Sequence, residues 1–223
     1  MSPLTHVVAV LMVGAASHLI TVPIIRRLRR QLADTVWQMH HDPQTRLLSR
    51  AGLVAEHERW RRTDQPLALV LVDLTDVKPV NDTVGHQAGD DLRRALGARI
   101  QQVADLHGGR AARLSGDELA VILPVPASDL PRVAAAILTR VRAPVTIAVD
   151  GGHLELQLPA RIGAAPGRPG NPLPDLLRHG DLALYHAKRA VNGPPYVVYE
   201  PGLDMPAAGG DRRRLRGGPP GRP

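Results

Sequence analysis

The run Leu67-Ala68-Leu69-Val70-Leu71-Val72-Asp73 carries the strongest structural signal in the chain. Its consecutive apolar residues predict a central strand of a sheet that other elements cover on both faces. The run ends at a carboxylate, and a lone buried carboxylate costs free energy unless it has a partner or a function. Asp73 is therefore the first candidate for a functional residue.

A second acidic segment, Ser115-Gly116-Asp117-Glu118-Leu119, predicts a tight turn between two strands over 111–114 and 118–123. If this hairpin neighbours the strand that ends at Asp73, three carboxylates converge at one edge of the sheet. Such a cluster repels itself unless a cation lies within it, and its hard oxygen ligands suit Mg²⁺ or Mn²⁺. For either segment alone, solvated acids in a surface turn are the simpler alternative.

The remaining pattern predicts an α/β (α+β) domain with a mixed or antiparallel sheet, because helices and strands alternate but two hairpins interrupt them. Asp42 and Pro43 predict the start of the first domain helix, as its N-cap and first residue. The expected helices cover about 43–62, 88–106, 130–141 and 173–190, and the further strands cover 145–149, 153–158 and 196–199.

Charge is concentrated at the two ends of the 223-residue chain, which has a formal net charge of +7 and no Cys. Residues 1–41 carry +3 and residues 202–223 carry +3, so the globular segment 42–201 is almost neutral at +1. A nucleic-acid partner is therefore not expected. The absence of Cys excludes disulfides and thiolate metal sites. The segment 202–223, rich in Gly, Pro and Arg, is expected to be a disordered basic tail.

The N-terminal segment from Val7 to Ile25 is mostly apolar. As a helix it would reach about 28 Å, enough to cross a hydrocarbon core. The basic cluster Arg26–Arg30 follows at once, so the positive-inside rule places the following domain in the cytoplasm. We therefore expect residues 1–25 to form the transmembrane helix of a single-pass protein of the cell membrane. The alternative is a buried or dimer-forming helix of a cytoplasmic protein.

Residues 26–41 are expected to continue as a helical stalk. Apolar residues at Ile25, Leu28, Leu32, Val36 and Met39 form a narrow stripe close to a heptad seam. The stripe fits a parallel coiled coil, and a single helix lying on the domain is an equal alternative. A two-helix stalk would bring two copies of the domain together.

Four segments of the domain follow one another in the order typical of one known family. Asp73–Asp90 is similar to the pattern Asp-x-Asp-x-Phe-Lys-x-x-Asn-Asp-x-x-Gly-His-x-x-Gly-Asp. Arg113–Leu119 is similar to Arg-x-Gly-Gly-Asp-Glu-Phe, and Asp181–Lys188 is similar to Asp-x-Ala-Leu-Tyr-x-Ala-Lys. Asp42–Arg50 is similar, more loosely, to Asp-x-Leu-Thr-Gly-Leu-x-Asn-Arg. On these motifs the segment 42–201 resembles the GGDEF family, whose members convert GTP to cyclic di-GMP.

The resemblance implies a fold and a reaction. The fold would be a nucleotidyl cyclase domain like a polymerase palm, with a central mixed sheet wrapped by helices. In the reaction, the ribose 3′-hydroxyl of one GTP would attack the α-phosphorus of another, and pyrophosphate would leave. The product would serve bacterial second-messenger signalling. Because one domain binds one GTP, the enzyme would act as a homodimer of facing domains, joined through the Ile25–Met39 helix.

The resemblance also assigns the metal and catalytic residues. Asp73, Asp117 and Glu118, with the backbone carbonyl of Leu74, would hold Mg²⁺ or Mn²⁺. Glu118 would also help to remove the proton from the attacking hydroxyl. The catalytic set is therefore Asp73, Asp117 and Glu118.

Substrate contacts follow from the same motifs. Asn81 and Asp90 would recognise guanine, whose adjacent N1–H and N2–H₂ donors suit a carboxylate in a way that adenine cannot match. Lys78 and Lys188 would contact the phosphates. The turn at Ser115 and Gly116 would lie against the substrate.

The chain departs from the family pattern at Thr75, Val77, Ser115, Leu119 and Asn192. Ser115 replaces a glycine and adds a side chain where space is expected to be short. Asn192 falls where the family has a phosphate-binding arginine. Two interpretations therefore stay open: a working cyclase, and a degenerate domain that binds GTP or a partner protein without turnover.

Overall fold

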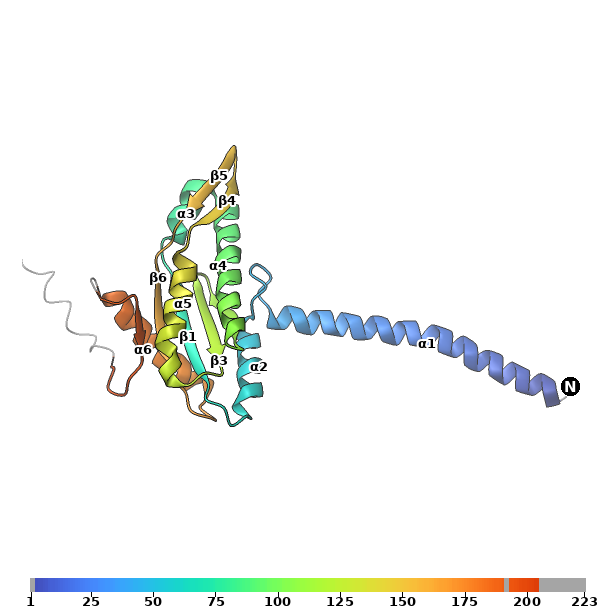
Figure 1. The fold of residues 1–223 in the computed structure, drawn as a ribbon. Coiled ribbons are helices and arrows are strands. Elements are labelled where there is room, and N and C mark those ends of the chain that lie inside the picture. Colours follow the sequence, from blue (N-terminus) through green and yellow to red (C-terminus); the bar gives the residue numbers. More distant parts are fainter. Residues whose placement is uncertain (1–2, 191–192, 205–223) are drawn as a thin grey trace, which may run out of the picture.

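A five-stranded sheet lies at the centre of the domain in this computed structural model, which describes residues 3–190 and 193–204 (Figure 1). The strands lie in the order β2-β3-β1-β6-β7. The pairs β1/β3, β1/β6 and β2/β3 are antiparallel, whereas β6/β7 is parallel. Their bounds are β1 (Ala68–Leu74), β2 (Arg110–Ser115), β3 (Glu118–Leu123), β6 (Ala160–Ala165) and β7 (Tyr196–Val198). The mixed sheet with β1 at its centre is confirmed.

Helices cover both faces of the sheet. The bounds are α2 (Arg50–Arg61) and α6 (Leu173–Arg189) on one side, and α4 (His86–Leu106) and α5 (Leu130–Arg142) on the other. Leu69 and Leu71 pack in one buried cluster with Leu176 of α6. Val70 and Val72 pack in the other, with residues of α4 and α5. Alternate residues of β1 thus face opposite layers, which explains its unbroken apolar sequence.

The central strand β6 was missed by the sequence analysis. Its residues Ala160–Ala165 are mostly small, and small residues do not have a strong strand propensity. The structure gives the reason for that composition, because α6 passes very close to β6. A Cβ at Gly163 would lie 2.2 Å from the backbone oxygen of Gly180 and 2.3 Å from Leu184 N. The small residues of β6 are therefore required by its packing against α6, and a local sequence pattern does not reveal such packing.

The start of the domain also differs from the expectation. The Asp42 carboxylate accepts hydrogen bonds from the backbone and side chain of Thr45, as an N-cap would, but only a turn follows and no helix begins there. Arg46 follows with φ of 62°, a left-handed conformation that cannot continue a helix. α2 begins only at Arg50, where the Ser49 hydroxyl accepts a hydrogen bond from Gly52 N.

Smaller elements complete the domain. α3 (Val77–Val84) precedes α4 and was not predicted, whereas the hairpin of β4 (Val145–Val149) and β5 (Gly152–Leu156) was. A short 3-10 turn, Ala127–Asp129, leads into α5. The hairpin and α3 lie at the same end of the domain (Figure 1).

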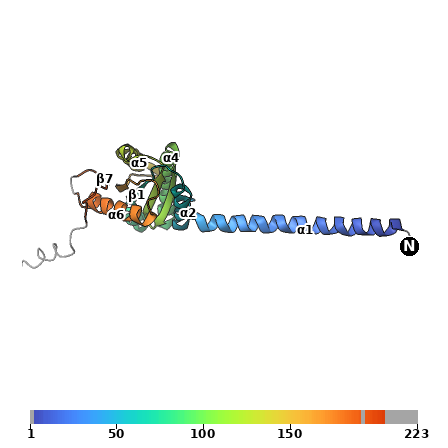
Figure 2. The same cartoon turned by 90° about the horizontal axis from the view of Figure 1, so that it is seen from below.

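α1 (Pro3–His40) is one continuous helix that spans the expected membrane segment and stalk. It projects away from the domain in both views (Figures 1 and 2). Its stripe residues Ile25, Leu28, Leu32, Val36 and Met39 are all at least 42% exposed. The alternative of a helix lying on the domain is therefore wrong, and the apolar stripe has no partner within the described chain.

The membrane expectation falls largely on side chains outside the described residues, at 7–11, 13–17 and 20. In the parts of the chain that the structure does describe, no helix combines the length and the apolar character needed to cross a membrane. Most of the expected basic tail, from residue 205 onward, also lies outside the described residues.

Candidate active site

Two strand ends and α6 bring acidic and basic side chains together at one edge of the sheet. In β1, Asp73 lies directly opposite Glu118 of β3 on one side and Arg161 of β6 on the other. Directly opposed residues of antiparallel strands project to the same face, with Cβ atoms about 5 Å apart. α6 covers this face, and Lys188 Nζ lies 2.7 Å from Asp73 Oδ1. Two carboxylates on β3 and β1 are therefore followed by an arginine on β6, and the lysine of α6 contacts the middle carboxylate.

The turn between β2 and β3 accommodates its serine without backbone strain. Gly116 has φ of 46°, the left-handed conformation that glycine adopts at little steric cost. Among the non-glycine residues in the described part of the chain, only Arg46 and Asp76 have positive φ, so Ser115 needs no glycine conformation. The Ser115 hydroxyl donates a hydrogen bond of 3.1 Å to Glu118 Oε2. This departure from the family pattern thus adds a contact to a candidate catalytic carboxylate.

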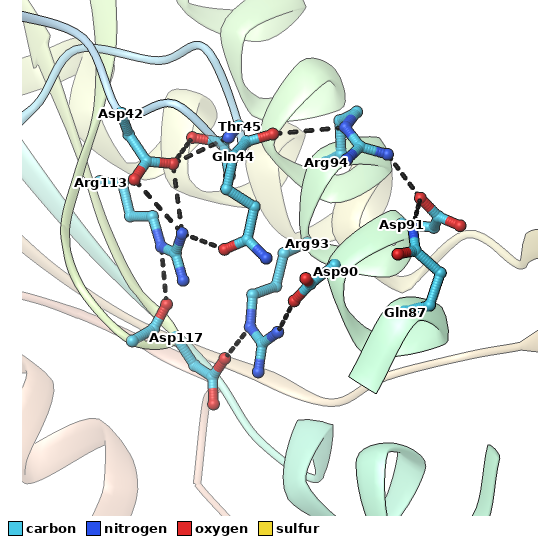
Figure 3. Close-up of polar contacts among 11 residues, drawn as sticks. Asp42, Gln44, Thr45, Gln87, Asp90, Asp91, Arg93, Arg94, Arg113 and Asp117 are labelled. Carbon is cyan, nitrogen blue, oxygen red and sulfur yellow. Dashed lines mark hydrogen bonds and ion pairs between the residues drawn. The ribbon is translucent and has the colours of Figure 1, made fainter. Parts of the chain in front are cut away.

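Asp117 lies on the other face of the sheet edge, although it adjoins Glu118 in the chain. Its backbone oxygen accepts a hydrogen bond from Leu74 N at 3.1 Å, which ties the turn to the end of β1. Its side chain points to α4, where Oδ1 accepts a 2.7 Å hydrogen bond from Arg93 Nε (Figure 3). Asp117 belongs to the turn and Glu118 is the first residue of β3, and their side chains have partners on different sides, Arg93 for Asp117 and Ser115 for Glu118.

The expected convergence of three carboxylates is corrected by this geometry. Asp73 and Glu118 share the α6 face, whereas Asp117 belongs to the α4 face. Within residues 3–190 and 193–204, no three His, Asp or Glu side chains gather as a metal-binding group. The oxygen donors that remain together are the two opposed carboxylates of β1 and β3.

The expected guanine-binding residues meet around Gly89 of α4. A Cβ at Gly89 would lie 1.8 Å from Asn81 Oδ1 and 3.5 Å from Arg93 Nη1. Asn81 Oδ1 is buried and has no hydrogen-bond partner among the described residues. A buried acceptor without a donor costs free energy, which is the state expected of a group that a ligand completes. Asp90 is half-exposed and accepts a 2.9 Å hydrogen bond from Arg93 Nη1.

The segment between β1 and α3 contains two further positions from the motif. Thr75 replaces an acidic residue of the family, and its backbone N and hydroxyl both donate to the backbone oxygen of Pro159. It therefore ties the end of β1 to the residues before β6. Lys78 is exposed on the first turn of α3 and forms no ion pair with a described residue. Its side chain is thus available for a ligand.

A second arginine links the turn to the loop after α1. Arg113 Nε donates to the backbone oxygen of Gly116 at 2.9 Å, and its Nη1 donates to Asp42 Oδ1 at 3.2 Å and to Gln44 Oε1 (Figure 3). Burial by itself raises the pKa of Asp42. Hydrogen bonds from Thr45 and Arg113 outweigh this effect and hold that pKa below its usual value. The ionised carboxylate therefore supports the turn at neutral pH.

Three charged residues near the site were not assigned from the sequence. Arg93 follows Asp90 by three residues, a spacing at which helical side chains meet, so a signal was available. Arg161 belongs to β6, which was not predicted, and no signal marks it. Asp181 lies in a recognised motif of α6. Its partial burial, together with the negative charge of Glu118, raises the pKa of Asp181. The Asp181 carboxylate is therefore close enough to Glu118 for the two charges to interact.

The position of Asn192, where the family has an arginine, lies outside the described residues. Lys188 and Arg161 are the cations that the described chain places at Asp73.

Comparison with known proteins gives a family match over most of the domain. Residues 39–193 match the family described as "Diguanylate cyclase, GGDEF domain". Diguanylate cyclase TpbB of Pseudomonas aeruginosa is 34% identical over 176 residues, which cover 75% of this chain and 39% of TpbB. A 19.3 kDa protein of Streptomyces ambofaciens is 35% identical over 162 residues, which cover 72% of this chain and 82% of that protein. The chain thus spans about two fifths of the length of TpbB.

Solved structures of related domains have the same fold. The coiled coil and GGDEF domain of DgcB from Caulobacter crescentus, in complex with c-di-GMP, superposes with a TM-score of 0.72 and 25% identity. The match covers 83% of this chain and 97% of the solved chain, which holds the coiled coil and GGDEF domain of DgcB. Diguanylate cyclase SiaD of Pseudomonas aeruginosa, in complex with its activator SiaC, has a TM-score of 0.62 and 24% identity, over 84% of this chain and 73% of SiaD. At that identity the likeness to SiaD shows the fold alone.

Proposed function

The chain belongs to the GGDEF family of diguanylate cyclases, and on that premise we propose that two copies of it condense two GTP molecules to cyclic di-GMP. The observation that carries the proposal is the pair of opposed carboxylates, Asp73 and Glu118, with Lys188 beside them at one sheet edge. Carboxylates and a cation in this arrangement suit a metal-assisted phosphoryl transfer. The product would act in bacterial second-messenger signalling.

The donor set at this edge fits a divalent cation, which we propose to be Mg²⁺ or Mn²⁺. Asp73 and Glu118 supply hard oxygen ligands from adjacent strands, and the Leu74 carbonyl is the next candidate donor. Asp117 joins this set if its carboxylate exchanges Arg93 for the ion. When bound, the ion would lower the pKa of the attacking hydroxyl and neutralise charge on the phosphoryl oxygens.

The other residues would bind and orient GTP. Asn81 and Asp90 would recognise the guanine edge, and Lys78 and Lys188 would contact the phosphates. Lys188 is 41% exposed, so little is lost when its contact with Asp73 is exchanged for a phosphate.

Glu118 would take the proton from the ribose 3′-hydroxyl of one GTP. The freed oxygen then forms a bond to the α-phosphorus of the other GTP. The bond from that phosphorus to the bridging oxygen of the β-phosphate breaks, and pyrophosphate leaves. Repetition of the step in the opposite sense closes the cyclic product.

The exposed stripe of α1 would pair two copies into a homodimer, because each domain is proposed to bind only one of the two GTP molecules. Leu32 is 65% exposed near the middle of the stripe, where a charge would be placed inside a paired seam. Leu106, at the end of α4, is 78% exposed and lies far from the stripe in the sequence. Leu32→Glu and Leu106→Glu therefore form a matched pair of surface changes.

We also propose that residues 7–25 anchor the protein in the cell membrane, with the domain in the cytoplasm. The apolar segment and the basic cluster Arg26–Arg30 support this proposal. Extraction of cell membranes at high pH checks it: a spanning segment stays in the pellet, and a peripheral one is released.

A single assay tests the enzymatic proposal. The full chain is incubated with GTP and Mg²⁺, and cyclic di-GMP and pyrophosphate are quantified over a series of chain concentrations. We expect product from the parent and from Leu106→Glu, and a loss of about tenfold or more for Leu32→Glu at low chain concentration, where dimers dissociate. Absence of product in the parent at every concentration, with Mg²⁺ and with Mn²⁺, would overturn the cyclase assignment.

A second candidate is a regulatory domain that binds GTP or a partner protein without turnover. The separation of Asp117 from Asp73 and Glu118 favours it, because the described residues do not form a three-carboxylate group. Binding of GTP without formation of product in the same assay would support this candidate.

A further inference from the structure

Arg93 of α4 binds two carboxylates that belong to different parts of the site. Its Nε donates to Asp117 Oδ1 at 2.7 Å, and its Nη1 donates to Asp90 Oδ1 at 2.9 Å (Figure 3). Asp90 lies one helical turn earlier on α4, whereas Asp117 lies in the turn between β2 and β3. One guanidinium thus joins the expected guanine-binding residue to the signature turn.

The contact restrains both partners. The Arg93 side chain is only 14% exposed, so its ion pairs are less screened by solvent than surface pairs. A guanidinium is a rigid planar fork, and its two donors hold two acceptors in a fixed relative position. A lysine ammonium at the same place is a point charge and does not impose that geometry.

We propose that Arg93 is a positioning residue that orients Asp90 for guanine and couples guanine recognition to the position of Asp117. The inference rests on the proposed binding of GTP at Asn81 and Asp90. Arg93 holds Asp90 Oδ1, which fixes the rotamer of the carboxylate before a ligand arrives. A preorganised carboxylate binds the two donors of guanine without first losing side-chain entropy. A shift of Asp117 would move the same guanidinium, and the guanidinium would in turn change the position of the Asp90 carboxylate.

The same helix provides a matched control. Arg94 pairs with Asp91 at the same three-residue spacing, and its Nε donates to the backbone oxygen of Gln44. Arg94 is 51% exposed, and it contacts neither Asp90 nor Asp117 in the contacts of the described chain (Figure 3). A substitution of Arg94 therefore removes an arginine from α4, as a substitution of Arg93 does, but it leaves the bridge between Asp90 and Asp117 intact.

The test measures the affinities of GTP and inosine triphosphate by calorimetry for the parent, Arg93→Met, Arg93→Lys and Arg94→Met. Inosine lacks the N2 amine, so it forms one bond fewer to the carboxylate. We expect Arg93→Met to weaken GTP binding about tenfold and to lower the preference for GTP over inosine triphosphate. Arg93→Lys should recover only part of this loss, and Arg94→Met should bind within about twofold of the parent.

Each contrary outcome identifies what has failed. Unchanged GTP affinity and preference in Arg93→Met would overturn the inference. Equal weakening of both nucleotides, with a lower unfolding temperature, would show a structural role only. Full recovery by Arg93→Lys would show that charge alone matters and would overturn the bridging role. If Arg93→Met does not fold, Arg93→Lys decides by the same criterion. A parent that binds no GTP would overturn the proposed function itself.

Discussion

Asp117 and Glu118 are neighbours in the chain, yet they belong to two differently built halves of the site. Glu118 shares the α6 face with Asp73, where the contacting cation Lys188 is 41% exposed. Asp117 shares the α4 face with Asp90, where the contacting cation Arg93 is 14% exposed and donates to both. The first contact is solvent-screened and exchangeable, while the second is held in place.

The difference matches what each half is proposed to do. Guanine is a rigid ligand with fixed donors, and it is recognised best by groups that are already in position. A metal ion that binds Asp73 must replace Lys188 there, and Lys188 must leave Asp73 to contact a phosphate, which a half-exposed lysine permits. The boundary between the two halves falls where the turn residue Asp117, which binds Arg93 of α4, meets Glu118, the first residue of β3.

The largest effects are expected from one substitution in each half: the α6 half should lose turnover, and the α4 half should lose its preference for guanine. Asp73→Asn removes a ligand charge from the α6 half and should reduce turnover at least about a hundredfold, since metal-assisted charge stabilisation is worth several kcal/mol. GTP binding should stay within a few-fold of the parent. Asp90→Asn, on the α4 half, should instead reduce the preference for GTP over ATP. Turnover assays and nucleotide calorimetry on the two variants check both statements.

The comparison breaks if the two variants lose the same property. A loss of guanine preference in Asp73→Asn, or an unchanged preference with lost turnover in Asp90→Asn, would show that the halves are not functionally distinct.

A smaller effect is expected from a single methyl group on α4. An alanine at Gly89 would place Cβ 1.8 Å from Asn81 Oδ1, so the Asn81 side chain must move. Alanine also improves helix propensity, so the helix itself should not be destabilised. We expect Gly89→Ala to weaken GTP binding about tenfold, because one recognition hydrogen bond is lost. Calorimetry with GTP measures the change.

Gly97→Ala on the same helix is the control, since its Cβ would meet the side chains of Leu47 at 3.1 Å and Thr45 at 3.6 Å but not Asn81. It should bind GTP within about twofold of the parent. Equal affinities for both variants would show that Asn81 does not contact the nucleotide.

The sequence predicted the elements whose signal is local. The apolar run of β1, the hairpin of β2 and β3, and the main helices each follow from periodicity. β6 was missed because its residues Ala160–Ala165 are mostly small to admit α6, and this packing between two elements does not appear in the pattern of the strand itself. The helix start expected at Asp42 was wrong because Arg46 adopts a φ of 62°, and Asp42 instead binds Arg113, 71 residues away. Long-range contacts of this kind leave no local pattern.

The candidate site was predicted in composition but not in arrangement. The motifs identified the carboxylates, but the expectation of one cluster did not foresee that Asp117, in the turn, points to α4 while Glu118 begins β3. The direction of Asp117 depends on how α4 packs against the turn between β2 and β3, because Arg93 of α4 binds it. Packing of this kind leaves no signal in the local sequence.

The smallest expected effect concerns charge crowding in the α6 half. Burial and the charge of Glu118 raise the pKa of Asp181 above its ordinary value of 3.8. The ionised form is therefore disfavoured in the folded state, and at pH 7 it lowers stability. Below pH 3.8 the group is protonated in both folded and unfolded chains and has no effect. Asp181→Asn should thus raise the free energy of unfolding at pH 7 by about 0.3 kcal/mol, a small value because the burial is only partial and solvent screens the charge.

Urea unfolding at pH 7 and pH 3 without divalent metal measures this gain, and a carboxyl NMR titration locates the pKa of Asp181 directly. The gain should vanish at pH 3, since the parent carboxyl is then neutral. In a Glu118→Gln background the pKa of Asp181 should fall, because one of the two causes of its shift has been removed. An Asp181 titration that does not respond to Glu118→Gln would show that the two carboxylates do not share the α6 half, and it would remove the electrostatic distinction between the two faces.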